Sequence, residues 1–221
     1  MMKATTCIAA LRERLSADVS LASTPGKVLY SSAATLEQSP IYFLGTNPGG
    51  GLPSTLAESI DDITSGSNEY LDYSWEGRPP GQAKLQKQVT RFLSALGFEP
   101  RDVPASNIVM TRSTGITTHQ DMDGDAQRCW PLHQIILESV RPRAILAFGS
   151  GQEKSAFAYL RAFLKPDKVE SIPAEQHGFT CHAFKASLET GVINVVVVPH
   201  LTRYSPYKKP KIMAWVKERL T

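Results

Sequence analysis

Apolar residues occur in two patterns along this chain, and each pattern predicts a different kind of element. Short continuous runs are typical of strands buried on both faces of a sheet. They occur at residues 41–44, 108–110, 144–148 and 192–198. Apolar residues three or four positions apart predict amphipathic helices. This spacing occurs at residues 5–19, 85–96, 131–140, 152–164 and 212–220.

The order of these elements predicts an α/β fold. Strands separated by helices favour crossover connections, which produce parallel strands with helices on both faces of the sheet. We therefore expect a three-layer αβα sandwich around a central, mainly parallel four-stranded sheet. Residues 20–40 and 46–81 are expected to be loops, the first with a short extended piece at residues 28–30. Residues 168–184 are expected to be irregular or β.

The length of 221 residues fits one domain of ordinary to large size or two small ones. We interpret the chain as a single domain over residues 1–221. In this interpretation residues 1–40 form an N-terminal helix and loop, and residues 41–221 form the core.

The overall composition excludes several classes of protein. Hydrophobic residues make up 42% of the chain and charged residues 20%, which excludes a disordered or fibrous protein. The net charge of +3 excludes a histone-like polycation. The charge is unevenly distributed, because residues 199–221 carry six basic side chains and one acidic, whereas residues 58–76 carry six acidic side chains and no basic one.

The cysteine content and the hydropathy of the chain indicate the cellular compartment in which we expect the protein. Three cysteines without a CxxC pair, at positions 7, 129 and 181, fit a reducing compartment better than a disulfide scaffold. The longest apolar run, at residues 192–198, is far shorter than the roughly 20 residues that span a bilayer. Charged residues interrupt the N-terminal apolar patch before a signal peptide could form. We expect a cytoplasmic monomer with no membrane partner.

Several common motifs are absent or incomplete. The glycine-rich segment 45–51 lacks the Gly-Lys-Ser/Thr ending of a P-loop and is not GxGxxG. Residues 148–151 do not match GxSxG, and the alternating aspartates at 121–125 fail the calcium-loop pattern at its sixth and twelfth positions. The histidines and cysteine at residues 177–182 match no known metal-site spacing. We therefore expect no metal site and no cofactor.

Ligands of such folds bind outside the carboxyl ends of the strands, and motifs at those ends resemble a known family. The sequence Gly-Thr-Asn-Pro-Gly at residues 45–49 and the sequence Pro-His-Leu-Thr-Arg-Tyr at residues 199–204 resemble the two active-site motifs of the uracil-DNA glycosylase superfamily. The first motif has the Gly-x-Asn-Pro-Gly form of the single-strand-selective and mismatch-specific branches. Residues 106–109 resemble the family's base-reading strand, and residues 129–149 resemble a helix–strand unit of its iron–sulfur branch.

The chain also departs from the family in three places. The second motif reads His-Leu-Thr-Arg-Tyr where the familiar form is His-Pro-Ser-Pro. The segment after the first motif is long and acidic. The four cysteines that hold the cluster of the iron–sulfur branch are absent, apart from Cys129 near one of those places. The last departure argues against an iron–sulfur cluster.

The resemblance implies a role for each residue of the two motifs. Asn47 would position a water molecule, and His200 would donate a hydrogen bond to the leaving base, where negative charge develops. Asn107 would read the base, since its amide can accept from uracil N3–H and donate to O4, whereas cytosine presents the opposite pattern. The remaining predicted base-binding residues of the first motif are Gly45, Thr46, Pro48 and Gly49.

A glycosylase also needs an aromatic platform and contacts with DNA. A flipped base stacks on an aromatic side chain. We predict Trp75 for this role, with Tyr73 and Tyr70 as alternatives. Basic side chains pair with phosphates. The predicted DNA-binding residues are Arg203, Tyr204, Lys208, Lys209 and Lys211.

Three functions remain open from the sequence. The first is a DNA repair glycosylase that hydrolyses uracil or a related deaminated base from single- or double-stranded DNA. The second is a catalytically inactive module of the same fold that binds nucleic acid, suggested by the altered second motif and the acidic segment. The third is a protein that binds a free base or nucleotide. The glycosylase hypothesis requires Asn47, Asn107 and His200 to converge on one pocket sized for a base, beside a groove wide enough for DNA. If the three side chains lay apart, both the mechanism and the resemblance to the family would be weakened.

Overall fold

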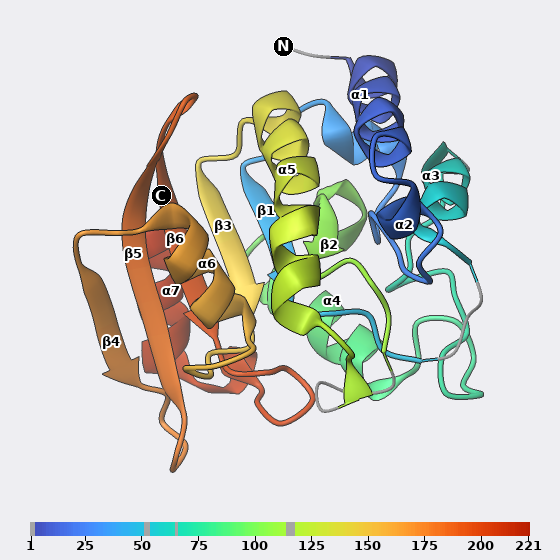
Figure 1. Cartoon of the computed structure of the whole chain (residues 1–221). Coiled ribbons are helices and arrows are strands. Elements are labelled where there is room, and N and C mark those ends of the chain that lie inside the picture. The colour runs from blue at the N-terminus through green and yellow to red at the C-terminus, as the bar shows by residue number, and fades with distance from the viewer. Residues whose placement is uncertain (1–2, 51–53, 65, 114–117) are drawn as a thin grey trace.

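A six-stranded mixed sheet lies at the centre of the computed structural model, which describes residues 3–50, 54–64, 66–113 and 118–221 (Figure 1). The strand order is β2-β1-β3-β6-β5-β4. The strands are β1 (Ile41–Gly45), β2 (Ala105–Asn107), β3 (Ala144–Phe148), β4 (Val169–Pro173), β5 (Thr180–Leu188) and β6 (Gly191–Val198). The α/β class expected from the sequence is confirmed, but the sheet has six strands where four were expected.

Four neighbouring strands of the sheet are parallel. β1 pairs with β2 on one side and with β3 on the other, and β3 pairs with β6. The remaining two strands, β5 and β4, are antiparallel and extend the sheet beyond β6. They lie largely in the segment for which an irregular or β structure was expected. The pattern there is weak because β4 is an edge strand whose residues are exposed or only partly buried.

Helices cover both faces of the sheet (Figure 1). One core packs alternate residues of the central strands, such as Tyr42 and Ile145, against α1 (Ala4–Ser16), α3 (Leu56–Thr64), α5 (Met122–Val140) and α6 (Ala156–Leu164). The other core packs the intervening residues, such as Phe43 and Leu146, against α4 (Lys84–Ala95) and α7 (Pro210–Leu220). The shorter helical turns are α2 (Val19–Ala22), η1 (Ala33–Leu36), η2 (Pro100–Asp102) and η4 (Pro206–Lys208).

Two sequence-based helix boundaries were wrong. The helix expected to begin at Pro131 begins at Met122, where the Asp121 side chain caps it by accepting from the Gly124 backbone N–H at 2.9 Å. Polar residues and a glycine weaken the apolar periodicity of its first turns, so the pattern is clear only after Pro131. The helix expected over residues 5–19 ends at Ser16, because Asp18 caps a separate turn by accepting from Leu21 N–H.

The second strand was predicted three residues too late. β2 ends at Asn107, and residues 108–110 follow it as buried but irregular chain. Ile108 N–H still donates to the carbonyl oxygen of Gly45, the last residue of β1, and Val109 N–H donates to that of Thr46, the next residue. Their hydrophobicity therefore reflects burial beneath α5. The shift places Asn107 at the carboxyl end of β2.

The loop regions also differ in part from expectation. Residues 46–81 contain α3, which was not predicted. Residues 28–30 are buried beside β2, where Tyr30 N–H donates to Ala105 O at 2.6 Å, but they form no strand. All three cysteines are buried and free of disulfides. Among the described helices, none combines the length and the apolar character that a bilayer crossing requires.

Candidate functional site

A cavity of about 530 Å³ lies at the carboxyl ends of the parallel strands. Five of the predicted site residues line it, namely Asn47, Gly49, Trp75, Asn107 and His200. Asn47 follows β1, Asn107 ends β2 and His200 comes two residues after the end of β6. Parallel strands bring these ends to one edge of the sheet. Asn47 and His200 therefore line the same cavity although they lie 153 positions apart in the chain.

The Asn47 side chain is held in one orientation. Its amide nitrogen donates to Ser113 Oγ at 2.9 Å and to the Pro48 carbonyl oxygen at 3.2 Å. A carbonyl oxygen can only accept, so the nitrogen end of the amide must face Pro48. The Oδ1 atom is thereby left as the acceptor that Asn47 can offer to a water molecule or ligand in the cavity.

The His200 ring is held by the two residues that follow it. Its Nδ1 lies 2.8 Å from Thr202 Oγ1 and accepts from the Thr202 backbone N–H at 3.3 Å. Since a backbone N–H can only donate, Nδ1 carries no proton and the neutral ring has its proton on Nε2. Burial, and secondarily the Arg203 cation, lower the pKa of His200 below its usual value. Near neutral pH the ring is thus a neutral Nε2–H donor, packed edge-on against Phe148 at 5.1 Å.

Asn107 occupies space that only a glycine at position 45 leaves open. The two residues are opposite one another in the β1–β2 register. A Cβ atom at Gly45 would overlap Asn107 Oδ1 and would lie 2.8 Å from Phe148 Cζ. Gly45 therefore contributes to the site by its missing side chain, which lets Asn107 lie across the end of β1. Asn107 is 4% exposed.

Two other residues of the first motif support the loop rather than line the cavity. Thr46 is buried, and its Oγ1 accepts from the Ala156 backbone N–H at 3.2 Å, which connects the loop to the start of α6. Pro48 is also buried and its carbonyl oxygen accepts from Asn47 and from Ser113 N–H. Neither Thr46 nor Pro48 is among the residues that line the cavity, so their predicted contact with a base stays a prediction.

An aromatic wall faces the cavity. Trp75 packs edge-on against Tyr30 and Tyr70, with ring centroids 6.0 and 5.6 Å away. Tyr30, Tyr70 and Phe148 also line the cavity. Tyr73 does not, because its ring lies beneath the Lys27 ammonium at 5.3 Å and its hydroxyl contacts Ser67. Tyr30 and Phe148 were not predicted as site residues, although Phe148 ends a predicted strand, and that position could have indicated it.

A buried carboxylate anchors this wall. Glu69 accepts from Trp75 Nε1 at 3.1 Å, and its other oxygen lies 2.7 Å from Lys27 Nζ in an ion pair. The Glu69 side chain is 5% exposed and that of Lys27 10%. Glu69 lines the cavity, so it places a negative charge beside the aromatic rings while holding Trp75 in position.

The acidic segment 58–76 is largely neutralised by ion pairs. Asp61 pairs with Arg12, Asp62 and Glu69 both pair with Lys27, and Asp72 pairs with Arg101. Through these ion pairs, most carboxylates of the segment hold it against the N-terminal part of the chain and against η2. Glu76 differs, because it is exposed and lines the cavity.

Arg112 brings a positive charge into the same cavity. Its Nη1 donates to the Gly49 carbonyl oxygen, and its Nε is buried without a hydrogen-bond partner. Its chain segment, Thr111 to Ser113, follows β2 and also supplies the hydroxyl that holds Asn47. Arg112 was not predicted as a site residue, because it belongs to neither of the two motifs.

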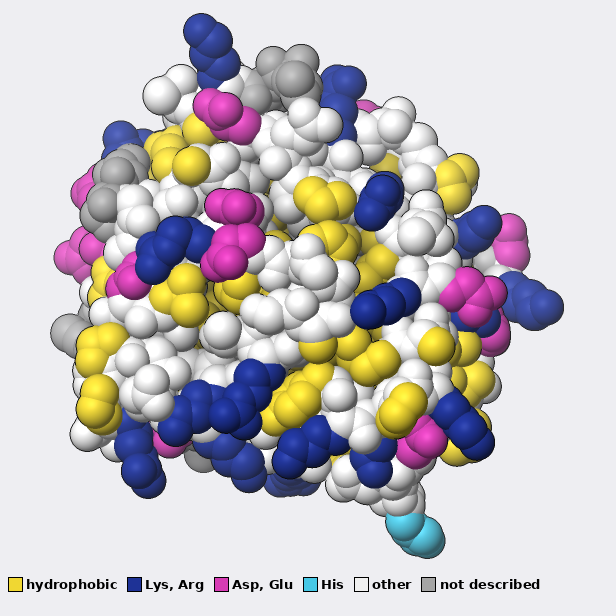
Figure 2. Space-filling view, turned by 180° about the vertical axis from the view of Figure 1, so that it is seen from behind, with side chains coloured by type: hydrophobic (Ala, Val, Ile, Leu, Met, Phe, Trp, Pro, Cys, Tyr) yellow, Lys and Arg dark blue, Asp and Glu magenta, His cyan; other side chains and the backbone are white. Residues whose placement is uncertain are grey.

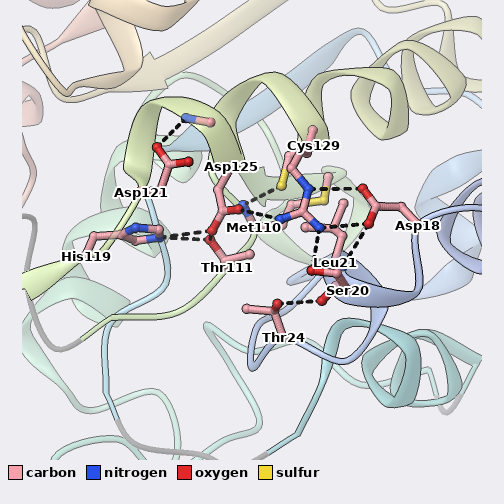
Figure 3. Close-up of polar contacts among 12 residues, drawn as sticks. Asp18, Ser20, Leu21, Thr24, Met110, Thr111, His119, Asp121, Asp125 and Cys129 are labelled. Carbon is pink, nitrogen blue, oxygen red and sulfur yellow. Dashed lines mark hydrogen bonds and ion pairs between the residues drawn. The ribbon is translucent and has the colours of Figure 1, made fainter.

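A polar cluster fastens that segment to α5 (Figure 3). The Thr111 hydroxyl donates to Asp125 Oδ2 at 2.7 Å and lies 2.8 Å from His119 Nε2. Asp125 also pairs with Arg128, which makes two hydrogen bonds to Asp18. The Arg128 guanidinium, and secondarily Leu21 N–H, lower the pKa of Asp18 to about 2. These contacts hold the backbone that presents Arg112 and Ser113.

The predicted DNA-binding residues fall into two groups. Arg203, Lys208 and Lys211 are exposed, and Lys209 is partly exposed with its Nζ donating to the Glu175 carbonyl oxygen at 2.9 Å. Tyr204 is 2% exposed and its hydroxyl donates to the Ala174 carbonyl oxygen at 2.7 Å. The prediction that Tyr204 contacts DNA is therefore wrong for this structure, since its ring belongs to the core beneath the loop.

A scan of the sequence against models of known protein families finds no match, and a search of curated proteins finds none either.

Proposed function

We propose that this protein is a DNA N-glycosylase that hydrolyses the bond between deoxyribose and uracil or a related deaminated base. One observation carries the proposal: Asn47, Asn107 and His200 come from three strand ends and line one cavity. These are the three polar residues that the resemblance to the uracil-DNA glycosylase superfamily selects. The parallel strand order β2-β1-β3-β6, with helices on both faces, agrees with the sandwich that the resemblance implies.

Asn47 has the geometry to hold the attacking water. The reaction breaks the bond between C1′ and the base nitrogen, the electron pair leaves with the base, and the water oxygen bonds to C1′. Asn47 Oδ1 accepts a hydrogen bond from the water and so orients the water oxygen toward the sugar. An amide cannot take up a proton at neutral pH, so the proton passes to solvent after attack and turnover is slow.

His200 has the protonation state that the leaving base requires. Negative charge builds on O2 of a departing pyrimidine, and the Nε2–H of a neutral imidazole donates to it. Thr202 supports this state by directing its backbone N–H toward Nδ1. The second motif has threonine where the familiar His-Pro-Ser-Pro form has serine, so a hydroxyl remains beside Nδ1 despite the altered sequence.

Asn107 and the aromatic wall would select the base. The Asn107 amide presents one acceptor and two donors to the edge of a flipped base, a pattern that suits uracil N3–H and O4 and opposes cytosine. Stacking on an aromatic ring contributes about 1–3 kcal/mol per base. Phe148 and Trp75, which both line the cavity, are the rings that we assign to this role.

Release of free base from defined oligonucleotides tests the proposal. Uracil, hypoxanthine and xanthine are each placed in single- and double-stranded DNA, and cleavage at the resulting abasic site is measured. We expect release of at least one base, and a loss of about 10²- to 10³-fold in His200→Ala, since a donor to a developing anion is worth about 3–4 kcal/mol. His177→Ala, a change at an exposed histidine between β4 and β5, serves as the matched control. Absence of release from every substrate would overturn the proposal.

The size of the cavity favours a second candidate. A volume of about 530 Å³ lies within the usual range for small-molecule pockets and exceeds that of a single base. A protein of this fold that binds a free nucleotide would use Arg112 for the phosphate and Asn107 for the base. Deoxyuridine monophosphate would then raise the melting temperature, and no base would be released from DNA.

A further inference from the structure

We propose that the exposed face of α4 binds the sugar–phosphate backbone of the strand whose base enters the cavity. This inference rests on the proposed function for its choice of nucleic acid as the ligand. The face consists of Lys84, Lys87 and Arg91, and we call it the α4 basic stripe. All three side chains are exposed.

Helical spacing places the stripe opposite the core. Residues at i, i+3 and i+7 share one face of an α-helix. The buried side of α4 is formed instead by Gln86, Val89, Phe92 and Leu93. At 1.5 Å per residue the stripe extends about 10 Å along the helix axis, which is a length over which several phosphates of one strand can be neutralised.

The stripe begins at the cavity. Leu85, the neighbour of Lys84, lines the cavity together with Thr202 and His200. Figure 2 shows Lys and Arg side chains gathered along the lower edge of the molecule, the edge toward which the parallel strands run in Figure 1. A strand with one nucleotide in the cavity would therefore meet positive charge at once on leaving it.

A second basic element joins the stripe. Ser205 Oγ lies 3.1 Å from Gln88 Oε1, which fixes the loop after β6 against α4. Tyr207 lies where the two meet: its burial acts to raise the pKa of its hydroxyl, but Arg91 and, more weakly, Lys208 lower it below the usual value. The turn η4, which ends at Lys208, packs against α4, so the loop after β6 adds Lys208 to the basic residues of this surface.

The basic side chains of the stripe and of the adjoining loop are available to bind phosphates. Within the part of the chain that the structure describes, no carboxylate forms an ion pair with Lys84, Lys87, Arg91, Arg203 or Lys208. Elsewhere on the surface, Arg12, Arg101 and Arg128 are all paired with aspartates. Binding of a phosphate to the stripe would thus displace no internal ion pair.

The salt dependence of DNA binding tests the inference. The probe is a fluorescent single-stranded oligonucleotide without a deaminated base, and its affinity for the full chain is measured by anisotropy at several KCl concentrations. Each phosphate neutralised on a single strand contributes about −0.7 to the slope of log K against log[salt]. We expect the triple variant K84Q/K87Q/R91Q to bind at least about tenfold more weakly and to reduce the magnitude of the slope by about 2.

A triple variant with the same change in charge is the control. K168Q/K185Q/K217Q removes three exposed lysines that do not line the cavity, and two of them, Lys168 and Lys185, lie beside Asn194 of β6 in a separate hollow. We expect this variant to keep the wild-type slope. An equal loss in both variants, an unchanged slope in the α4 variant, or no measurable binding by the wild type would overturn the inference.

The outcome is separable from that of the proposed function. Base release with an unchanged α4 slope would overturn the inference alone. A reduced slope without base release would support the stripe and overturn the glycosylase.

Discussion

At the scale of single residues, Gly45 shows how a missing side chain shapes the site. Asn107 occupies the space that a Cβ atom at position 45 would take, and Phe148 closes it from the other side. Gly45, Asn107 and Phe148 end three neighbouring strands, so their distances are set by the strand register and not by any loop. This rigidity would suit the base-reading role that we propose for Asn107.

Substitution of Gly45 by alanine should therefore displace Asn107. We expect kcat/KM for uracil release to fall roughly 10- to 100-fold, the equivalent of about 1–3 kcal/mol for a misplaced hydrogen-bonding partner. Release assays on uracil oligonucleotides provide the measurement. Gly151→Ala is the matched control, because the nearest atoms to its added Cβ lie at an ordinary 3.6 Å. Equal activity of the two variants would show that Asn107 does not read the base.

At the scale of elements, the ion pair of Lys27 and Glu69 joins two segments that carry no regular structure. One segment covers the outer edge of β2, and the other supplies Tyr70 and Trp75 to the cavity. The start of α4 reinforces this contact, since Gln86 Nε2 donates to the carbonyl oxygens of Glu69 and Tyr73, both at 2.8 Å. The aromatic wall is thus held by polar contacts as well as by packing.

Glu69→Gln should destabilise the protein and loosen this wall. The change removes the buried carboxylate beside Lys27 and leaves that ammonium paired with Asp62, whose side chain is 47% exposed, so we expect a loss of about 2 kcal/mol in the free energy of unfolding. Urea denaturation measures it. Asp72→Asn breaks an exposed pair with Arg101 and should cost less than about 1 kcal/mol. A Glu69 variant no less stable than the Asp72 variant would contradict this prediction.

At the scale of the whole molecule, His133 connects the layers of the fold. Its ring is fully buried in α5, its Nδ1 accepts from the Tyr42 hydroxyl of β1 at 2.9 Å, and its Nε2 donates to the Ile108 carbonyl oxygen at 3.1 Å. Both nitrogens are satisfied only when the ring is neutral. Burial accordingly lowers the pKa of His133 to about 4.

The free energy of unfolding should therefore fall as the pH is lowered from about 6.5 to about 4. The unfolded chain takes up a proton on His133 near pH 6.5, while the folded chain resists until about pH 4. Between these values the unfolded state binds more protons, so the free energy of unfolding falls as the pH falls, by up to about 3 kcal/mol. Urea denaturation at pH 7, 5.5 and 4.5 measures the slope. We expect the slope to diminish in His133→Gln, and an unchanged slope in that variant would contradict the assignment.

Local patterns largely predicted the central strands, but they did not predict the edge strand β4 or the position of β2. The runs at residues 41–44 and 144–148 become β1 and β3, buried at every position, because a central parallel strand must be apolar on both faces. β4 was not predicted as a distinct strand, because an edge strand need not be apolar on both faces. Residues 108–110 were wrongly predicted as a strand, because burial beneath α5 requires the same run of apolar residues in irregular chain.

The sequence alone determined which motifs follow the carboxyl ends of the strands, and hence the choice of Asn47, Asn107 and His200 as candidate site residues. Those choices depend on short motifs after apolar runs, and such patterns are local. The tertiary structure alone decided how each group is held, through pairs such as Asn47 with Ser113, Lys27 with Glu69 and Thr111 with Asp125. It also decided that Tyr204 belongs to the core and that Arg112 faces the cavity. These outcomes depend on which distant stretches of backbone lie together, and no local pattern of residues specifies that.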